Sequence, residues 1–201
     1  MSTASDKLRS IFGRRYGIAI ALLALAATIA FGTSYYVAQT QADRARALNL
    51  VSHQRSHSQR VGFLVSQLNQ TQDPQRIDAI QEELGDTVAR LRKGHDVLSG
   101  AASESERIRR FISPLEEIYQ SGSKPFHSMV IEFIEQAEYL SHPAVLDEPQ
   151  EVQERLELEV LRTAEYTMMQ TFGLMGLVLE AEAERANRLE KGIHFVLYLL
   201  L

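Results

Sequence analysis

Nine consecutive residues, Ser52 to Arg60, carry the side chains in this sequence that are best suited to bind a charged ligand. The stretch holds two arginines, two histidines and two glutamines but no apolar side chain, and apolar positions precede and follow it. Because a helix turns by about 100° per residue, nine residues cover all its faces, so some of these groups must face other helices or a partner chain. Buried polar groups without partners are costly, and arginine holds anions through bidentate contacts. The stretch favours a pocket for a small anionic or polar ligand; the alternative is a solvated polar collar.

Histidine spacing raises the question of a metal site. His53 and His57 stand four residues apart, so a helix would place both on one face. No third ligand is evident in the sequence, so we expect no metal and interpret the pair as a polar lining that responds to pH. His95 lies on an apolar stripe, which predicts a core histidine that makes one hydrogen bond.

Composition excludes several classes of chemistry. The 201 residues include no cysteine, which rules out disulfides, zinc–thiolate sites, iron–sulfur clusters and a cysteine nucleophile. The formal net charge of −5 argues against a nucleic-acid-binding surface, because phosphate binding needs concentrated Lys and Arg. The sequence has no Gly-rich phosphate loop, nucleophile elbow or paired-carboxylate signature. We therefore expect no cofactor, no catalytic residues and no enzymatic activity in this segment.

The N-terminal region has the pattern of a membrane anchor. No charged residue occurs between Arg15 and Asp43, and residues 17–38 are long and apolar enough to cross a bilayer. Residues 1–16 carry four basic side chains against Asp6, so the positive-inside rule places them in the cytoplasm. A cleaved signal peptide, with a cleavage pattern at Ala24-Leu25-Ala26, is the alternative.

The C-terminal region repeats the apolar pattern. Residues 194–201 form an apolar run that we expect to begin a second membrane helix, truncated here because so short a run cannot span a bilayer. The alternative is a buried helix of the core. Residues 39–193 would then be an acidic extracytoplasmic domain, with 17 basic and 25 acidic residues. The predicted location is the bacterial inner membrane, with this domain in the periplasm.

Helical periodicity runs through the whole of residues 39–193. The first helix has no Gly or Pro stop before Asp73-Pro74, a strong N-cap signal for the next helix, which Gly100 ends. Pro114 is expected to kink or end a shorter helix, and a further helix stops at His142-Pro143. The predicted fold is all-α: an up-and-down four-helix bundle whose long first and last helices continue into transmembrane helices.

The polar stretch also resembles a known motif. Asn49 to Arg55 and Ser58 to Arg60 resemble the N-x-x-G-x-Q-R-M-L-S-Q-R motif of the PilJ-type sensor family, the N-terminal domain of type IV pili methyl-accepting chemotaxis transducers. That domain also occurs in histidine kinases and diguanylate cyclases. Leu91 to Gly100 resembles the "kGH..L..G" segment of the family, and Glu180 to Lys191 resembles the approach to its second membrane helix. The family glycine is Ser52 here, and its Met-Leu pair is Ser56-His57.

The resemblance implies a ligand-sensing input domain of a transmembrane receptor of a two-component or chemotaxis type, working as a homodimer. In the related nitrate and nitrite sensor kinases, an arginine of the equivalent helix binds the anion at the dimer interface, and the resemblance gives that role to Arg55. The candidate ligand-binding residues are Gln54, Arg55, His57, Ser58, Gln59 and Arg60. The competing hypothesis is a helical bundle that tethers envelope proteins without a ligand.

Overall fold

The computed structural model describes residues 3–103, 105–120 and 125–200, and all the regular structure in these ranges is helical. The prediction of an all-α fold is confirmed. The up-and-down four-helix arrangement and the attachment to a membrane stay predictions. The chain divides into two units, residues 1–42 and 43–201, and the candidate site lies in the second unit.

Helix α1, Thr3–Gln70, is a single helix that contains both the apolar segment and the polar stretch. As predicted, it continues without a break until just before Asp73. It is the one helix among the described residues that is long and apolar enough to cross a membrane, with a mean hydropathy of 2.0 in its apolar window. The structure does not describe the side chains of Lys7, Arg9 and Arg14, nor those of residues 194–201, on which the predicted N-terminal flank and second membrane helix depend.

Helix α2, Pro74–Leu98, begins and ends at the predicted signals. The Asp73 carboxylate accepts a hydrogen bond of 3.1 Å from the backbone N–H of Gln75, which satisfies one of the free donors of the first turn. Gly100 has φ of +84°, a left-handed conformation that glycine adopts without a steric penalty. Side chains at three- and four-residue spacing, including Leu84 and Leu91, are fully buried.

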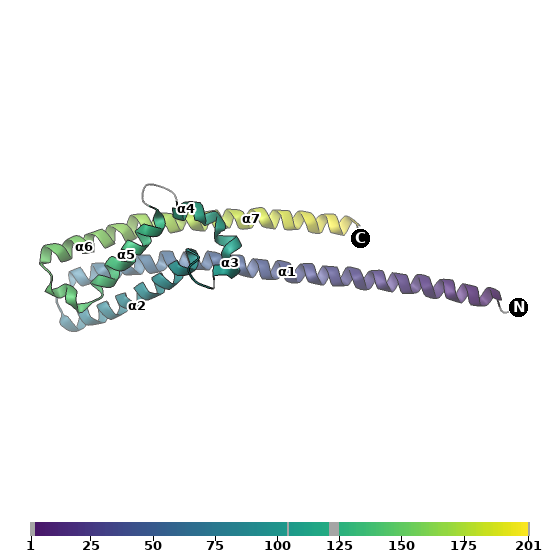
Figure 1. The fold of residues 1–201 in the computed structure, drawn as a ribbon, viewed down its shortest axis with the longest axis horizontal. Helices are drawn as coiled ribbons and strands as arrows, with labels where there is room; N and C mark the ends of the chain where they lie inside the picture. The colour runs from purple at the N-terminus through teal and green to yellow at the C-terminus, as the bar shows by residue number, and fades with distance from the viewer. Residues whose placement is uncertain (1–2, 104, 121–124, 201) are drawn as a thin grey trace. The chain divides into compact units, whose positions relative to one another are not determined.

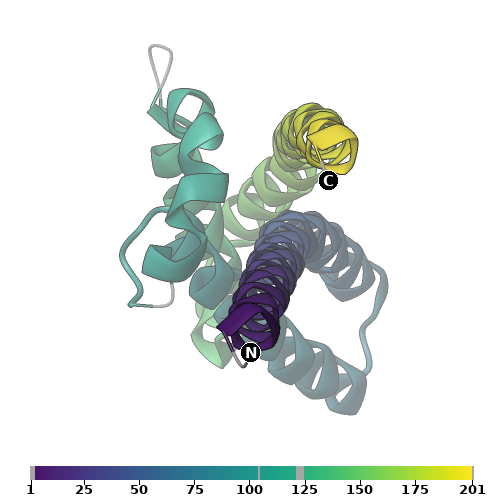
Figure 2. The same ribbon diagram turned by 90° about the vertical axis from the view of Figure 1, so that its right-hand side faces the viewer.

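Short helices and α5 follow. Helix α3, Ser105–Ile112, passes through a 3₁₀ turn, Ser113–Leu115, into α4, Glu116–Gln120, so Pro114 interrupts the α-helix as expected. Helix α5, Phe126–Leu140, packs along α2, and a second 3₁₀ turn covers Pro143–Asp147. Figure 1 shows α2 and α5 side by side, and in Figure 2 the short helices, in teal, lie to one side of α7.

The last part of the chain differs from the uninterrupted helix that the periodicity predicts. Helix α6, Gln150–Arg162, and helix α7, Met169–Leu200, are joined by a π-helical segment, Thr163–Met168. Buried residues here recur every four positions, at Val160, Ala164, Met168 and Phe172. In an α-helix each such step drifts by about 40° around the axis, because four residues exceed the 3.6 of one turn. The wider π turn offsets that drift and keeps the four side chains on the buried face.

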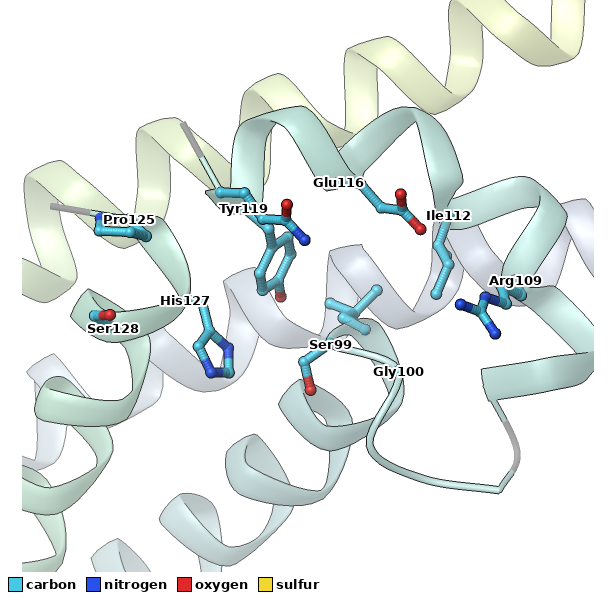
Figure 3. A pocket seen from close by; sticks show the side chains of 11 residues that line it. Ser99, Gly100, Arg109, Ile112, Glu116, Tyr119, Pro125, His127 and Ser128 are labelled. Carbon is cyan, nitrogen blue, oxygen red and sulfur yellow. The ribbon is translucent and has the colours of Figure 1, made fainter. Parts of the chain in front are cut away.

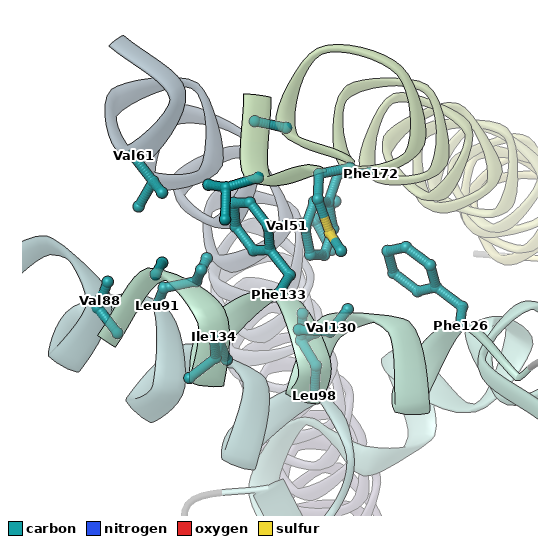
Figure 4. Packing of buried hydrophobic residues seen from close by; sticks show 14 of the residues in the cluster. Val51, Val61, Val88, Leu91, Leu98, Phe126, Val130, Phe133, Ile134 and Phe172 are labelled. Carbon is teal, nitrogen blue, oxygen red and sulfur yellow. The ribbon is translucent and has the colours of Figure 1, made fainter. Parts of the chain in front are cut away.

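The hydrophobic core draws on the second half of α1, on α2, on α5 and on the π segment with α7. Phe133 and Phe172 are the largest of its fully buried side chains, and Phe126 meets Phe172 edge to face at 5.3 Å between ring centroids. Figure 4 shows Val51 and Phe172 close to Phe133. The core holds the second half of α1 in one rotational setting, which decides which residues of the polar stretch point outward.

Candidate functional site

The polar stretch of α1 is divided between the inside and the outside of the protein. Gln54 and Ser58, one helical turn apart, are fully buried, whereas His53, Arg55 and Arg60 are exposed. The Ser58 hydroxyl donates a hydrogen bond of 2.9 Å to the backbone carbonyl of Gln54. Both buried side chains thus lie in the protein interior.

Gln54 packs against a glycine of α2. A Cβ atom added to Gly94 would lie 1.8 Å from Gln54 Nε2, so a residue with a side chain does not fit there unless Gln54 moves. The Oε1 atom of Gln54 is buried and has no hydrogen-bond partner in the part of the chain that the structure describes. This contact joins the two segments, around Gln54 and around Gly94, that carry the resemblance to the PilJ-type family.

Arg55 points to the other side of α1, toward α7. It lines a groove of about 540 Å³ together with Ser52, Gly173, Leu174, Leu177 and Glu180. A Cβ atom on Gly173 would lie 4.0 Å from the Arg55 guanidinium, an ordinary van der Waals distance, so Gly173 of α7 is a neighbour of that group. Within the described part of the chain, no ion pair engages Arg55. The acidic side chain of Glu180 lines the same groove but does not form an ion pair with Arg55.

Arg60 is engaged within the protein. Its Nε atom donates to Glu83 Oε1 at 2.9 Å, its Nη2 atom pairs with the same oxygen, and its guanidinium lies 5.0 Å from the centroid of Phe63. Both partners of this ion pair are about half exposed, so its contribution to stability is small. Arg60 nevertheless faces α2 and not the groove that contains Arg55.

His57 and Gln59 occupy two further positions around the helix. The rings of His53 and His57 stack with centroids 6.1 Å apart, and partial burial, His53 and Arg90 lower the pKa of His57, which favours the neutral ring. Gln59 lines a cavity of about 640 Å³ beside the π segment, with Gly62 and Tyr166 among its other residues. In the described ranges, no group of three His, Asp or Glu residues is arranged to hold a metal ion.

The six predicted binding residues therefore do not form one pocket within the protomer. Of the six, Arg55 lines the groove beside α7, together with Ser52, which was not a candidate, and the other five face the core, α2 or the π segment. The sequence reasoning missed the α7 side of the groove. A signal was available in the helical spacing, because Leu174 and Leu177 lie off the stripe that Met168, Phe172 and Met175 form, which predicts apolar side chains on an outer face of the helix.

The exposed apolar side chains of α7 extend from this groove. Leu174 and Leu177 are 52% and 63% exposed, and Met169 and Tyr166 lie further along the same helical rod. Exposed apolar rows of this kind are typical of surfaces that associate, and exposed guanidinium groups are typical of sites that bind anions.

Comparisons with known proteins identify no relative of this chain. No protein-family model matches the chain, and neither a curated protein nor a solved structure matches it. The resemblance to the PilJ-type sensor family therefore stays a prediction.

Proposed function

We propose that this chain is the ligand-sensing input region of a bacterial transmembrane receptor. In this proposal residues 17–38 anchor it in the inner membrane, the N-terminus lies in the cytoplasm, and residues 39–193 sense a ligand in the periplasm as a homodimer. The observation that carries the proposal is the unpaired, exposed guanidinium of Arg55 beside exposed leucines of α7.

Association of two copies through this face would bury the leucines and bring Arg55 of each copy into a partly dehydrated interface. Burial of apolar area contributes about 25 cal/mol per Å², so it favours association. Two guanidinium groups near each other repel, and the repulsion grows as water is removed. An anion between them relieves that repulsion and pairs with both. The anion therefore stabilises the dimer and shifts its population by mass action.

Signal transmission follows from the same arrangement. A ligand changes output only through different affinities for two states of the receptor. Arg55 lies on α1 and Gly173 on α7, so an anion at Arg55 acts where the first and last helices meet. A small shift of α7 relative to α1 is the expected response, and a kinase, cyclase or methyl-accepting coiled coil is the expected class of output.

Cysteine crosslinking tests the dimer, because the natural chain has no cysteine that would compete. Ser52→Cys places a thiol on the face of Arg55, and Ala79→Cys places one on an exposed position of α2 as the matched control. Disulfides form only when Cα atoms come within about 7 Å, so membranes containing Ser52→Cys should yield crosslinked dimer and those containing Ala79→Cys should not. Equal crosslinking of both variants contradicts this interface.

Anion dependence tests the ligand. Dimerisation of the 201-residue protein in detergent is measured with nitrate, nitrite and sulfate at constant ionic strength. At least one anion should strengthen the dimer, Arg55→Ala should abolish the effect, and Arg55→Lys should weaken it, because a single ammonium cannot make a bidentate contact. Arg76→Ala, an exposed residue of α2, is the control. A dimer that ignores every anion supports the tethering function instead.

A further inference from the structure

A second cavity lies apart from Arg55, where α2 ends and the short helices begin. It has a volume of about 540 Å³, and Figure 3 shows side chains from α2, α3, α4 and α5 around it. The residues that matter for its chemistry are Ser99, Arg109, Ile112, Glu116, Tyr119 and His127. None of them belongs to the polar stretch of α1.

Tyr119 brings a buried, unsatisfied hydroxyl to this cavity. Only 5% of the residue is exposed, and its hydroxyl has no hydrogen-bond partner within the described ranges. In Figure 3 the ring of Tyr119 points toward the space between His127 and Ser99. Because a buried hydroxyl normally finds a partner, this one, next to the cavity, has a hydrogen bond to offer to a water or to a ligand atom that reaches it.

Two histidines lie close to Tyr119: His127, which lines the cavity, and His95, which is buried next to it. The ring centroid of His95 lies 4.8 Å from that of His127 and 5.8 Å from that of Tyr119. His95 is 3% exposed, and neither of its ring nitrogens has a hydrogen-bond partner among the described residues, so the expectation of one hydrogen bond was wrong. Packing alone holds this ring, because it lies among aromatic neighbours. Three buried polar atoms without partners thus gather at one place, each costing stability.

The rim of the cavity carries two opposite charges. Arg109 and Glu116 both line it and are exposed, and no ion pair within the described ranges joins either of them to another residue. Ile112 and Leu98 supply apolar wall between the polar groups. A molecule that carries both a carboxylate and an ammonium group would satisfy both charges at once, and a small apolar body would lie against the aliphatic side chains.

We propose that this cavity is a second ligand site that binds a small zwitterion of the amino-acid class. Arg109 pairs with the carboxylate, Glu116 pairs with the ammonium group, and the Tyr119 hydroxyl donates a hydrogen bond to an oxygen of the ligand. The site is separate from the groove that contains Arg55, since the two share no lining residue.

Binding of defined probes to the 201-residue protein in detergent tests the proposal. The twenty common L-amino acids are compared with carboxylic acids that lack the ammonium group, such as propionate for alanine and 3-phenylpropionate for phenylalanine. At least one amino acid should raise the midpoint of thermal unfolding and bind by calorimetry, and its des-amino partner should bind at least about tenfold more weakly. Absence of binding by all twenty, or equal binding by the partner acid, overturns it.

Tyr119→Phe separates ligand binding from a structural role. It keeps the ring and removes the orphaned hydroxyl, so the unliganded protein should unfold at a higher temperature while affinity for the amino acid falls roughly tenfold. Tyr139→Phe is the matched control, because the Tyr139 hydroxyl already has a partner, donating to Glu148 at 2.8 Å. It should leave binding unchanged. A Tyr119→Phe protein that binds as tightly as the parent overturns the proposal.

Charge variants test the two ends of the ligand. Arg109→Gln and Glu116→Gln change exposed residues, so the fold should be retained, and each should weaken binding of the amino acid at least about tenfold. Glu116→Gln should leave binding of the des-amino acid unchanged, because that probe has no ammonium group. Equal loss for both probes contradicts the assigned orientation.

Discussion

His95 makes the stability of this protein depend on acidity in a defined range. Its burial, and next the neighbouring His127, lower the pKa of His95 from 6.5 to about 4; Asp96 opposes that shift and Arg92 adds to it. The folded protein therefore binds fewer protons than the unfolded chain between about pH 4 and pH 6.5. The free energy of unfolding should rise with pH through this window and reach its full value above pH 6.5.

The size of this change in the free energy of unfolding follows from the same pKa of His95. Each tenfold difference in proton affinity between the two states corresponds to about 1.4 kcal/mol. The difference between 6.5 and about 4 therefore corresponds to about 3 kcal/mol of stability that is lost on acidification. This is a large share of the 5–15 kcal/mol that is typical of a folded domain.

Urea unfolding of the protein in a mild detergent, followed by far-UV circular dichroism from pH 4 to pH 7.5, measures the effect. His95→Met fills a similar volume without a titratable group, so most of the dependence on pH should disappear. Its stability at pH 7.5 should not fall, because two unpartnered ring nitrogens are removed. His142→Met, at an exposed position, is the control and should follow the parent. If His95→Met keeps the pH dependence of the parent, the argument from burial is refuted.

Three further predictions concern packing, capping and topology. Gly94→Ala should destabilise the protein by about 1–3 kcal/mol, because its Cβ would overlap Gln54, and combining it with Gln54→Ala should recover part of that loss in urea unfolding. Asp73→Ala should cost about 1 kcal/mol in the same measurement, since it removes the N-cap of α2. Reporter fusions should show position 10 in the cytoplasm and position 120 in the periplasm; a cytoplasmic reporter active at 120 contradicts the topology.

Much of the helical framework was predictable because its signals are local. Asp73-Pro74, Gly100 and Pro114 act on the backbone within one or two turns, so their effects do not depend on distant contacts. The π segment was also encoded, in the four-residue spacing from Val160 to Phe172. The spacing resembles that of an ordinary amphipathic α-helix. It differs because each four-residue step moves the apolar side chain about 40° around an α-helix, which a π turn corrects.

The candidate sites were less predictable because they depend on how the helices pack. The nine residues of the polar stretch do not by themselves predict that Gln54 faces the core and Arg55 faces α7. The buried apolar side chains before and after the stretch fix the rotation of the helix and so determine which residues face inward. Tyr119 and His95 come from different helices, and neither lies in a motif of known chemistry. Their unpartnered polar atoms become visible only when α2, α4 and α5 are packed together.

The contact between Gln54 and Gly94 connects the two proposed sites. Gln54 precedes Arg55 on α1, and Gly94 precedes His95 on α2, so the anion groove and the aromatic cluster each lie next to this contact. Because the Gln54 amide occupies the space of a missing side chain, rotation of α1 cannot leave Gly94 undisturbed. An anion at Arg55 that favours one setting of α1 therefore alters the packing around His95. We therefore expect the two proposed sites to be coupled, and by linkage each ligand would change the affinity for the other by the same factor.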